Sequence, residues 1–195
     1  MKQLFTLLVA LFAFSLSSLV QAGSTFYQQH GEWASMLYYG ESNSVGRIVH
    51  KNGNSILLID YGEDTNLVFA FQDIHTSVNL NRIKDKNPTF IPTDLRVDKK
   101  KVYSVQSGLW VDVNTRTFFI YFPVNELGKQ FFDDLETGNT LRIRVGSGRN
   151  VIIINIPLAG FTEASHRAKE LYKEYLISNA SVRERIRKEE QEYFN

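Results

Sequence analysis

The chain has 195 residues, of which 43% are hydrophobic and 22% are charged, and its 22 Lys and Arg nearly balance its 21 Asp and Glu. This balance argues against a nucleic-acid partner, whose phosphates favour a strongly basic domain. The sequence contains no cysteine, which excludes disulfides, a lipoprotein attachment thiol, a thiol nucleophile and zinc–thiolate sites. Stability must therefore come from apolar packing, for which the sequence offers 14 Phe, 9 Tyr and 2 Trp.

Residues 1–22 have the pattern of a secretory signal peptide. Lys2 provides a positive start, Leu4 to Leu16 is an almost uninterrupted apolar run, and Val20-Gln21-Ala22 fits a signal-peptidase site. An uncleaved membrane anchor is the alternative, but the run is shorter than the about 20 residues that a span needs. We therefore expect cleavage after Ala22 and no membrane span in the mature chain. The expected compartment is the periplasm of a Gram-negative bacterium, or alternatively the cell surface or the medium.

Short β-branched and aromatic runs separated by turn residues follow the signal peptide. Residues 23–44 are aromatic and polar without a sustained period, and we expect one strand there. Further strands are predicted at 45–50, 56–60, 67–71, 78–83, 89–97, 102–106, 109–113 and 117–122. Asn52-Gly53 lies between the first two of these, and a tight type I′ turn needs two residues that tolerate positive φ. The pattern therefore predicts antiparallel pairing.

The hydrophobic period becomes helical at residues 124–135. Leu127, Phe131 and Leu135 share one stripe, which predicts a short amphipathic helix packed on the sheet. Asn125 is the expected N-cap, and Gly138 is expected to end the helix.

Two more strands are predicted at 140–145 and 150–156, joined by a turn at Gly146–Arg149. The first alternates strictly, with Arg142 and Arg144 on one face, which is typical of a half-exposed strand. The second contains Val151-Ile152-Ile153-Ile154, which is apolar on both faces. We therefore expect it in the centre of the sheet.

A second helix is predicted at 162–177, with a break at Ser178-Asn179. A capping-box pattern at Ser181–Glu184 then begins a charged helical tail. Its thin apolar stripe of Val182, Ile186 and Tyr193 offers too little surface for firm docking, so we expect the tail to be exposed and to make candidate partner contacts.

The expected organisation is a signal peptide at 1–22, one β-rich domain at 23–178 and a charged helical tail at 179–195. The fold class is mainly β, at the margin of α+β. Its expected architecture is an antiparallel sandwich or barrel with a short inserted helix and a C-terminal helix plus exposed helical tail.

No motif indicates catalysis, a metal or a cofactor. The four histidines, His30, His50, His75 and His166, stand on separate predicted elements without the paired spacing of metal ligands. No Gly-x-Ser-x-Gly or similar nucleophile motif occurs. Gly146-Ser147-Gly148 is followed by a strand rather than by the helix that a phosphate loop requires. We expect a protein that is not an enzyme and has no cofactor.

Two acidic groups have alternative interpretations. Asp60, Glu63, Asp64 and Asn66 follow a strand and could hold calcium, but their spacing does not match a calcium loop and favours a plain turn. A hydrolase would require Asp60, Glu63 or His75 to converge in space. Asp133 and Asp134 are helix neighbours that diverge by about 100°, so we place both on the solvated side of the helix.

Basic residues concentrate in the middle of the chain and recur near residue 145. If joined in space, they would make a candidate basic binding face for an acidic protein, a glycan or an anionic lipid headgroup. The alternative is that they are solvated lysines and arginines that protect strand edges from aggregation. The candidate residues are Arg82, Lys84, Lys86, Arg96, Lys99, Lys100, Lys101, Arg142, Arg144 and Arg149.

Two segments near the C-terminus resemble the closing part of the invasion-associated locus B family of exported bacterial proteins. These are Leu135-Glu136-Thr137-Gly138-Asn139-Thr140-Leu141-Arg142-Ile143 and Ile154-Asn155-Ile156-Pro157-Leu158-Ala159-Gly160-Phe161-Thr162-Glu163-Ala164, and Trp33 near the mature start also fits. The resemblance implies a small β-rich periplasmic or surface domain, named for host-cell invasion, without a defined catalytic site. It supplies no functional residue for this chain.

Together these observations predict an exported, non-enzymatic binding or accessory protein of the bacterial envelope that recognises another protein or an anionic surface. The alternative is a carrier that holds a lipid or another hydrophobic small molecule within a β-sandwich or barrel.

Overall fold

The structure is a computed structural model that describes residues 24–39, 44–72, 88–147 and 150–194, so the signal peptide and the strand predicted at 78–83 lie outside the described residues. One antiparallel sheet has the strand order β1-β2-β3-β4-β5-β8-β7-β6-β9-β10. The strands are β1 (Ser24–His30), β2 (Trp33–Tyr39), β3 (Ser44–Asn52), β4 (Ser55–Tyr61), β5 (Asn66–Gln72), β6 (Thr89–Val97), β7 (Val102–Asp112), β8 (Thr117–Phe122), β9 (Thr140–Ser147) and β10 (Asn150–Pro157). The helices are α3 (Val124–Thr137) and α4 (Phe161–Phe194).

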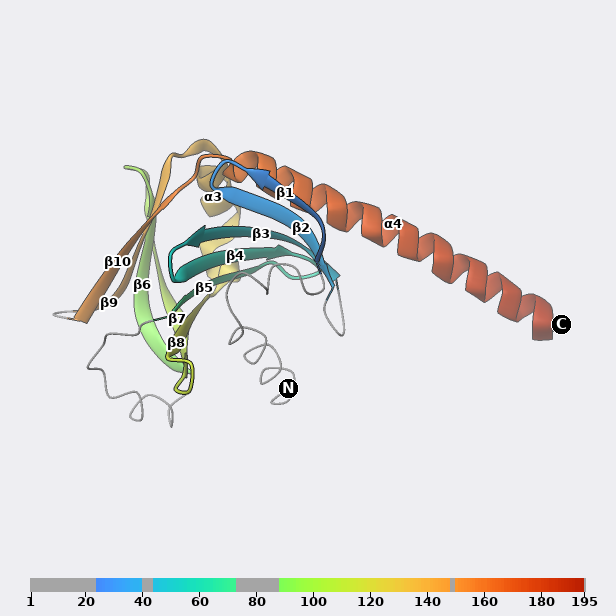
Figure 1. Cartoon of the computed structure of the whole chain (residues 1–195), viewed down its shortest axis with the longest axis horizontal. Coiled ribbons are helices and arrows are strands. Elements are labelled where there is room, and N and C mark those ends of the chain that lie inside the picture. Colours follow the sequence, from blue (N-terminus) through green and yellow to red (C-terminus); the bar gives the residue numbers. More distant parts are fainter. Residues whose placement is uncertain (1–23, 40–43, 73–87, 148–149, 195) are drawn as a thin grey trace.

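The sheet is strongly curved and is not closed. Strands β1–β5 follow one another as a meander, and the pairing of β5 with β8 joins them to the other five strands. Figure 1 shows the two groups as two curved layers, with α3 between them and α4 along β1 and β2. The mainly β, antiparallel fold class with an inserted helix and a C-terminal helix is confirmed. A single open sheet is its particular form.

The two ends of the sheet approach each other where the β1–β2 turn meets the start of α4. The Trp33 indole Nε1 donates a 2.9 Å hydrogen bond to the carbonyl of Pro157, and the Glu32 amide donates to the carbonyl of Ala159 at 3.3 Å. Trp33 is fully buried and lies edge-on to the Phe161 ring, with 5.0 Å between ring centroids. This contact fixes the sheet ends at one corner and leaves the rest of β1 and β10 unpaired with each other.

Most strand predictions are confirmed within a few residues, including the β3–β4 hairpin, where Gly53 has φ +55°. Two differ. The leading segment holds two strands, β1 and β2, and the runs predicted at 102–106 and 109–113 form the single strand β7. Gly108 continues β7 because it pairs with Phe90 on one side and Tyr121 on the other, and this two-sided pairing outweighs the weak strand preference of glycine.

The prediction that 150–156 forms a central strand is wrong, because β10 is an edge strand paired with β9 alone. Ile152 and Ile153 are 46% and 59% exposed. An apolar run indicates that side chains on both faces of a strand favour burial. It carries no information on whether both of its sides find a neighbouring strand.

The main core fills the concave face of the sheet. Alternate residues of the strands from β2 to β10 pack there against Leu127, Phe131 and Leu135 of α3 and against Phe161, Ala164 and Ala168 of α4. A smaller cluster of Met36, Val49, Ile56 and Leu58 lies on the opposite face of β2–β4. Aromatic and aliphatic packing therefore supplies the stability that a chain without cysteine needs.

Helix α3 differs in detail from its prediction. It begins after Pro123 and shows no side-chain cap, so the capping role predicted for Asn125 is wrong, whereas Gly138 does end the helix. Gly128 has φ +70° and interrupts the first turns. Asp134 is only 7% exposed, so its predicted place on the solvated side is also wrong.

Asp134 is buried because it holds α3 onto the sheet. It accepts a 2.7 Å hydrogen bond from the hydroxyl of Tyr103 on β7, a second from Gln130, and lies 3.3 Å from Lys100 Nζ. Burial alone would raise the pKa of the Asp134 carboxyl, but these donors outweigh it and hold that pKa below its usual value. Burial and the Asp134 contact raise the pKa of Tyr103 to about 12.

Helix α4 runs without interruption from Phe161 to Phe194, so the break predicted at Ser178-Asn179 is wrong. A serine and an asparagine inside a helix each cost only about 0.5 kcal/mol relative to alanine, which neighbouring helical turns can offset. The first half packs on β1–β4, where the buried Tyr61 hydroxyl and Ser165 Oγ share a 2.9 Å hydrogen bond. The second half projects away from the sheet (Figure 1).

Candidate binding surface

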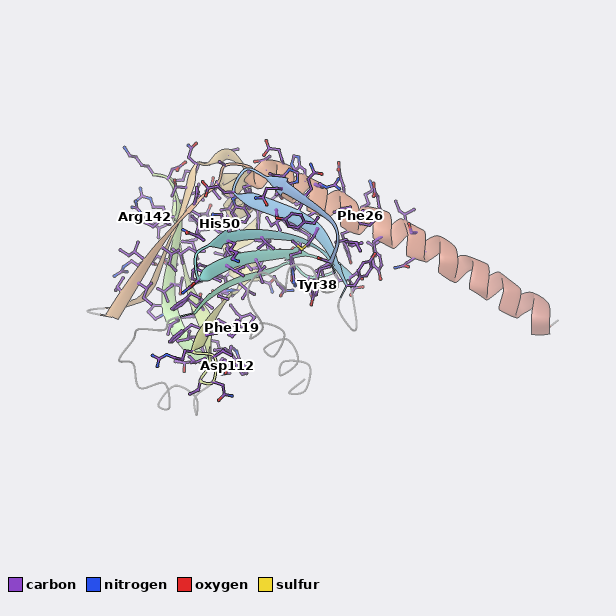
Figure 2. The ribbon with its side chains drawn as sticks, in the orientation of Figure 1. Phe26, Tyr38, His50, Asp112, Phe119 and Arg142 are labelled. Atoms are coloured by element: carbon purple, nitrogen blue, oxygen red, sulfur yellow. The ribbon has the colours of Figure 1, made fainter. Side chains whose placement is uncertain are left out.

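Strands β6 and β9 place three arginines on the convex face of the sheet. Leu95, Val97 and the apolar residues of β9 point into the core, so the residues between them point outward. Register then puts Arg96 of β6 directly opposite Arg142 of β9, and Asp94 directly opposite Arg144. Figure 2 shows Arg142 on the side of the molecule away from the projecting end of α4.

Two of these arginines have no carboxylate partner among the described residues. Arg142 Nε donates to the side-chain oxygen of Asn155 at 3.1 Å, and Arg96 Nε donates to the carbonyl of Lys100 at 3.1 Å. Arg144 differs, because its guanidinium forms a 3.1 Å ion pair with Asp94. Like charges directly opposite in a sheet repel each other, so Arg96 and Arg142 form a local concentration of positive charge.

Exposed apolar side chains lie on the same face of the sheet, one directly beside Arg96 and one about 20 Å from it along β6. Val102 of β7 pairs with Arg96 and is 46% exposed, and Phe90 at the start of β6 is 69% exposed. Phe90 lies opposite Gly108 of β7, which has no side chain to cover its ring. We call the set of Phe90, Arg96, Val102, Arg142 and Arg144 the arginine face.

The other predicted basic residues do not all join the arginine face. Lys100 turns toward α3, where its Nζ donates to Thr137 Oγ1 at 2.6 Å and meets Asp134. Lys101 lies over the Tyr103 ring at 5.2 Å, and Lys99 is exposed in the β6–β7 turn. Arg82, Lys84, Lys86 and Arg149 lie outside the described residues.

The predicted tail contacts lie in the projecting half of α4. Val182, Ile186 and Tyr193 belong to the helix, and their side chains lie outside the described part of the structure. Within the described helices, no segment is both long and apolar enough to cross a membrane.

The acidic residues considered for a calcium or hydrolase site do not converge among the described residues. Asp60 pairs with Arg47 through two hydrogen bonds of 2.6 and 2.8 Å, and Arg47 also lies 3.8 Å from the centre of the Tyr38 ring. Burial lowers and the Asp60 carboxylate raises the Arg47 pKa, with a net rise. Glu63 is exposed and His75 lies outside the described residues.

The described histidines are also separate. His30 Nε2 shares a 2.9 Å hydrogen bond with Ser35 Oγ, whereas the buried His50 Nε2 faces Glu32 at 3.3 Å. His166 is exposed on α4. Among the described residues, no group of three or more His, Cys, Asp or Glu side chains is placed to hold a metal ion.

Sequence reasoning missed Phe90 and Val102. Both sit in alternating strands on the same face as Arg96, so the period-2 pattern could have located them once the core face was known. It could not show that β9 pairs with β6 rather than with β8, which is what brings Arg142 to Arg96.

Comparison with known proteins supports the fold. No family model and no curated protein matches the sequence. The crystal structure of invasion associated protein B from Bartonella henselae is similar, with a TM-score of 0.53 and 16% identity over 77% of this chain and 99% of that one. At this identity the likeness concerns the fold alone. It is in keeping with the family resemblance seen near the C-terminus.

Proposed function

We propose that this chain is an exported, non-enzymatic binding or accessory protein that recognises an acidic surface of a partner protein through the arginine face. The carrying observation is the placement of Arg96 and Arg142 opposite each other with no carboxylate partner in the described structure. A guanidinium presents donors in a planar fork that matches a carboxylate, so a partner's Asp or Glu would relieve the repulsion between the two arginines.

The composition of the arginine face favours a protein partner over a lipid surface. Arginine and aromatic residues are enriched in protein interfaces, whereas lysine is depleted from them. The arginine face combines three arginines with Phe90 and Val102, while Lys100 turns toward α3 and Lys101 lies over the Tyr103 ring. The similar fold of an invasion associated protein also supports an accessory role.

Export is part of the proposal and rests on residues 1–22, which have the signal-peptide pattern. We place the mature chain in the periplasm, with the surface or the medium as alternatives. N-terminal sequencing of the protein from fractionated cells should give Gly23 as the first residue. A full-length chain recovered from the cytoplasm would contradict export.

The binding proposal is tested by photo-crosslinking in living cells. A photoreactive phenylalanine analogue at Phe90 should join the chain to an envelope protein, identified by mass spectrometry. Charge reversal of both Arg96→Glu and Arg142→Glu should then reduce the crosslinked species at least tenfold, because it sets like charges against the partner. Lys129→Glu on α3 reverses one charge at an exposed site, so it is the matched control for each single arginine variant, Arg96→Glu or Arg142→Glu, measured beside the double variant.

Equal loss in the control would indicate a general charge effect, and an unchanged crosslink in the double variant would contradict the proposal. Crosslinks to lipid alone would favour an anionic membrane surface instead. The alternative of a hydrophobic-ligand carrier has no supporting observation among the described residues, since α3 and α4 pack against the concave face.

A further inference from the structure

Among the described residues, one side of β10 has no neighbouring strand, and we call it the free side; it presents main-chain groups at alternate residues. The Leu158 amide donates to the Asn139 carbonyl, while the Thr140 amide and carbonyl bond to Asp98. In an antiparallel ladder the hydrogen-bonded residues alternate. Since Pro157 pairs with Thr140, the main-chain groups of Val151, Ile153 and Asn155 point away from β9 and toward the free side.

Pro157 marks the end of this available edge. Its backbone has no N–H, and its outward carbonyl already accepts the hydrogen bond from the Trp33 indole. The remaining free segment, Val151–Asn155, is regular, contains no charge, and includes the exposed Ile152 and Ile153. Its midpoint is Ile153.

The opposite edge of the sheet is protected by contrast. β1 contains a bulge between Thr25 and Gln28, where Phe26 has φ +60° and Phe26 and Tyr27 are exposed. A bulge of this kind breaks the even row of main-chain groups that a further strand requires. The molecule therefore has one edge that resists strand addition and one that favours it.

We propose that β10 pairs with β10 of a second copy of this chain, antiparallel and centred on Ile153. A two-fold axis there places Ile153 opposite its counterpart, and Val151 opposite the second copy's Asn155. Each of the three outward residues then exchanges two main-chain hydrogen bonds, and the exposed isoleucines of both copies are brought together.

Symmetry and charge favour a second copy as the occupant. The available segment is bounded on one side by Pro157 and on the other by the end of the strand, so a two-fold axis through Ile153 uses all of it. Pairing β10 with itself closes the assembly, because the bulged β1 is the remaining edge. Arg144, which lies beside Ile153, is paired with Asp94 and adds little repulsion. Arg142, which lies beside Asn155, would share its row with the second copy's Val151 and Gly146 and not with the second copy's Arg142.

The absence of cysteine makes this geometry directly testable. In the purified full chain, Ile153→Cys should form a disulfide with itself, because hydrogen-bonded opposite residues are about 5.5 Å apart at Cα, within the range for a disulfide. Asn155→Cys alone should not, since its two copies would lie about 13 Å apart along the strands. A mixture of Val151→Cys and Asn155→Cys chains should crosslink to each other.

Light scattering supplies a second readout without cysteine. We expect the molar mass of the wild-type chain to approach twice the monomer value as concentration rises. Ile153→Pro should restore the monomer, because it removes an outward N–H while leaving the bonds to β9 intact. Circular dichroism should show the same strand content in both proteins.

Three results would overturn the proposal: a monomer at all accessible concentrations, equal crosslinking by Ile153→Cys and Asn155→Cys, or a crosslink of Ile153→Cys in cells to another protein only. The last would assign the edge to a foreign strand. Arg96 makes no contact with β10, so Arg96→Glu should weaken partner binding and leave the dimer unchanged.

Discussion

Each of the two helices is attached to the sheet by a hydrogen bond of a buried tyrosine hydroxyl, with a neutral partner in α4 and with a charged partner in α3. Helix α4 is joined to β4 through Tyr61 and Ser165, two neutral hydroxyls 2.9 Å apart. Helix α3 is joined to β7 through Tyr103 and the Asp134 carboxylate, 2.7 Å apart, with Lys100 completing the group. In each case a buried tyrosine of a strand presents its hydroxyl to a helix residue.

The two attachments differ in whether one of their groups is ionised. Burial raises the pKa of Tyr61 and that of Tyr103, so both phenols stay neutral over the ordinary pH range. Asp134 is the one member of the two pairs that is ionised at neutral pH. The Tyr103–Asp134 link of α3 therefore depends on acidity, whereas the Tyr61–Ser165 link of α4 does not.

The largest expected effect is on α4. A Cβ on Gly46 of β3 would lie 1.9 Å from the carbonyl oxygen of Ala168, a backbone atom that cannot move without shifting the helix. Gly46→Ala should lower the free energy of unfolding by about 3 kcal/mol in urea titrations. Gly108→Ala is the matched control, because its nearest neighbour would be Pro88 Cβ at 3.9 Å. Equal losses in the two variants would contradict this account of α4 docking.

The second largest effect is expected for the charged link between α3 and β7. Tyr103→Phe removes the hydroxyl that donates to Asp134 and leaves a buried carboxylate with fewer donors. We expect a loss of about 2 kcal/mol, because hydrogen bonds to charged groups are worth more than neutral ones. The pKa of Asp134, measured by NMR, should rise in this variant. An unchanged pKa would show that Lys100 and Gln130 suffice.

Asp134→Asn should cost about 1.5 kcal/mol at neutral pH, because it keeps the shape of the side chain and loses its charge. The pKa of Asp134 is lowered in the folded state, so its contribution is complete above the unfolded value of about 4 and is lost as pH falls through the folded value. Unfolding curves of wild type and variant should therefore converge as the pH falls below about 4. Parallel curves would refute the assignment.

The smallest effect is expected for the neutral attachment. Tyr61→Phe removes one hydrogen bond and leaves Ser165 Oγ buried, which should cost about 1 kcal/mol. Its cost should be the same from about pH 5 to pH 9, since neither hydroxyl titrates there. A pH-dependent cost would mean that the contrast between the two helices does not hold.

The sequence reveals the strands and the core face well because both depend on local periodicity. The alternation of Leu141, Arg142, Ile143 and Arg144 predicts which side chains are buried, and the structure confirms it. The order of the strands in the sheet depends instead on pairing between residues far apart in the sequence. β5 pairs with β8 and β6 with β9, although other strands lie between the partners in the sequence. No local pattern encodes such partners, so the apolar run of β10 did not reveal its place at the edge.

The candidate surface could be predicted only in part for the same reason. Charge density along the chain indicated Arg96, Arg142 and Arg144, and these three do share one face. It also included Lys100, whose side chain is instead drawn to Asp134, a carboxylate that the helical wheel placed in solvent. The wrong placement of Asp134 in solvent therefore explains the wrong placement of Lys100 on the basic face.

The uninterrupted length of α4 sets how far its last residues lie from the body of the protein. Leu171 is buried against the body and the helix continues to Phe194, which at about 1.5 Å per residue carries the C-terminus roughly 35 Å beyond that point. In a pair joined through β10, two such arms would be held at fixed positions about one axis. The distance between the two helix ends would then be set by the geometry of the pair, and removing whole helical turns from α4 would shorten it in steps.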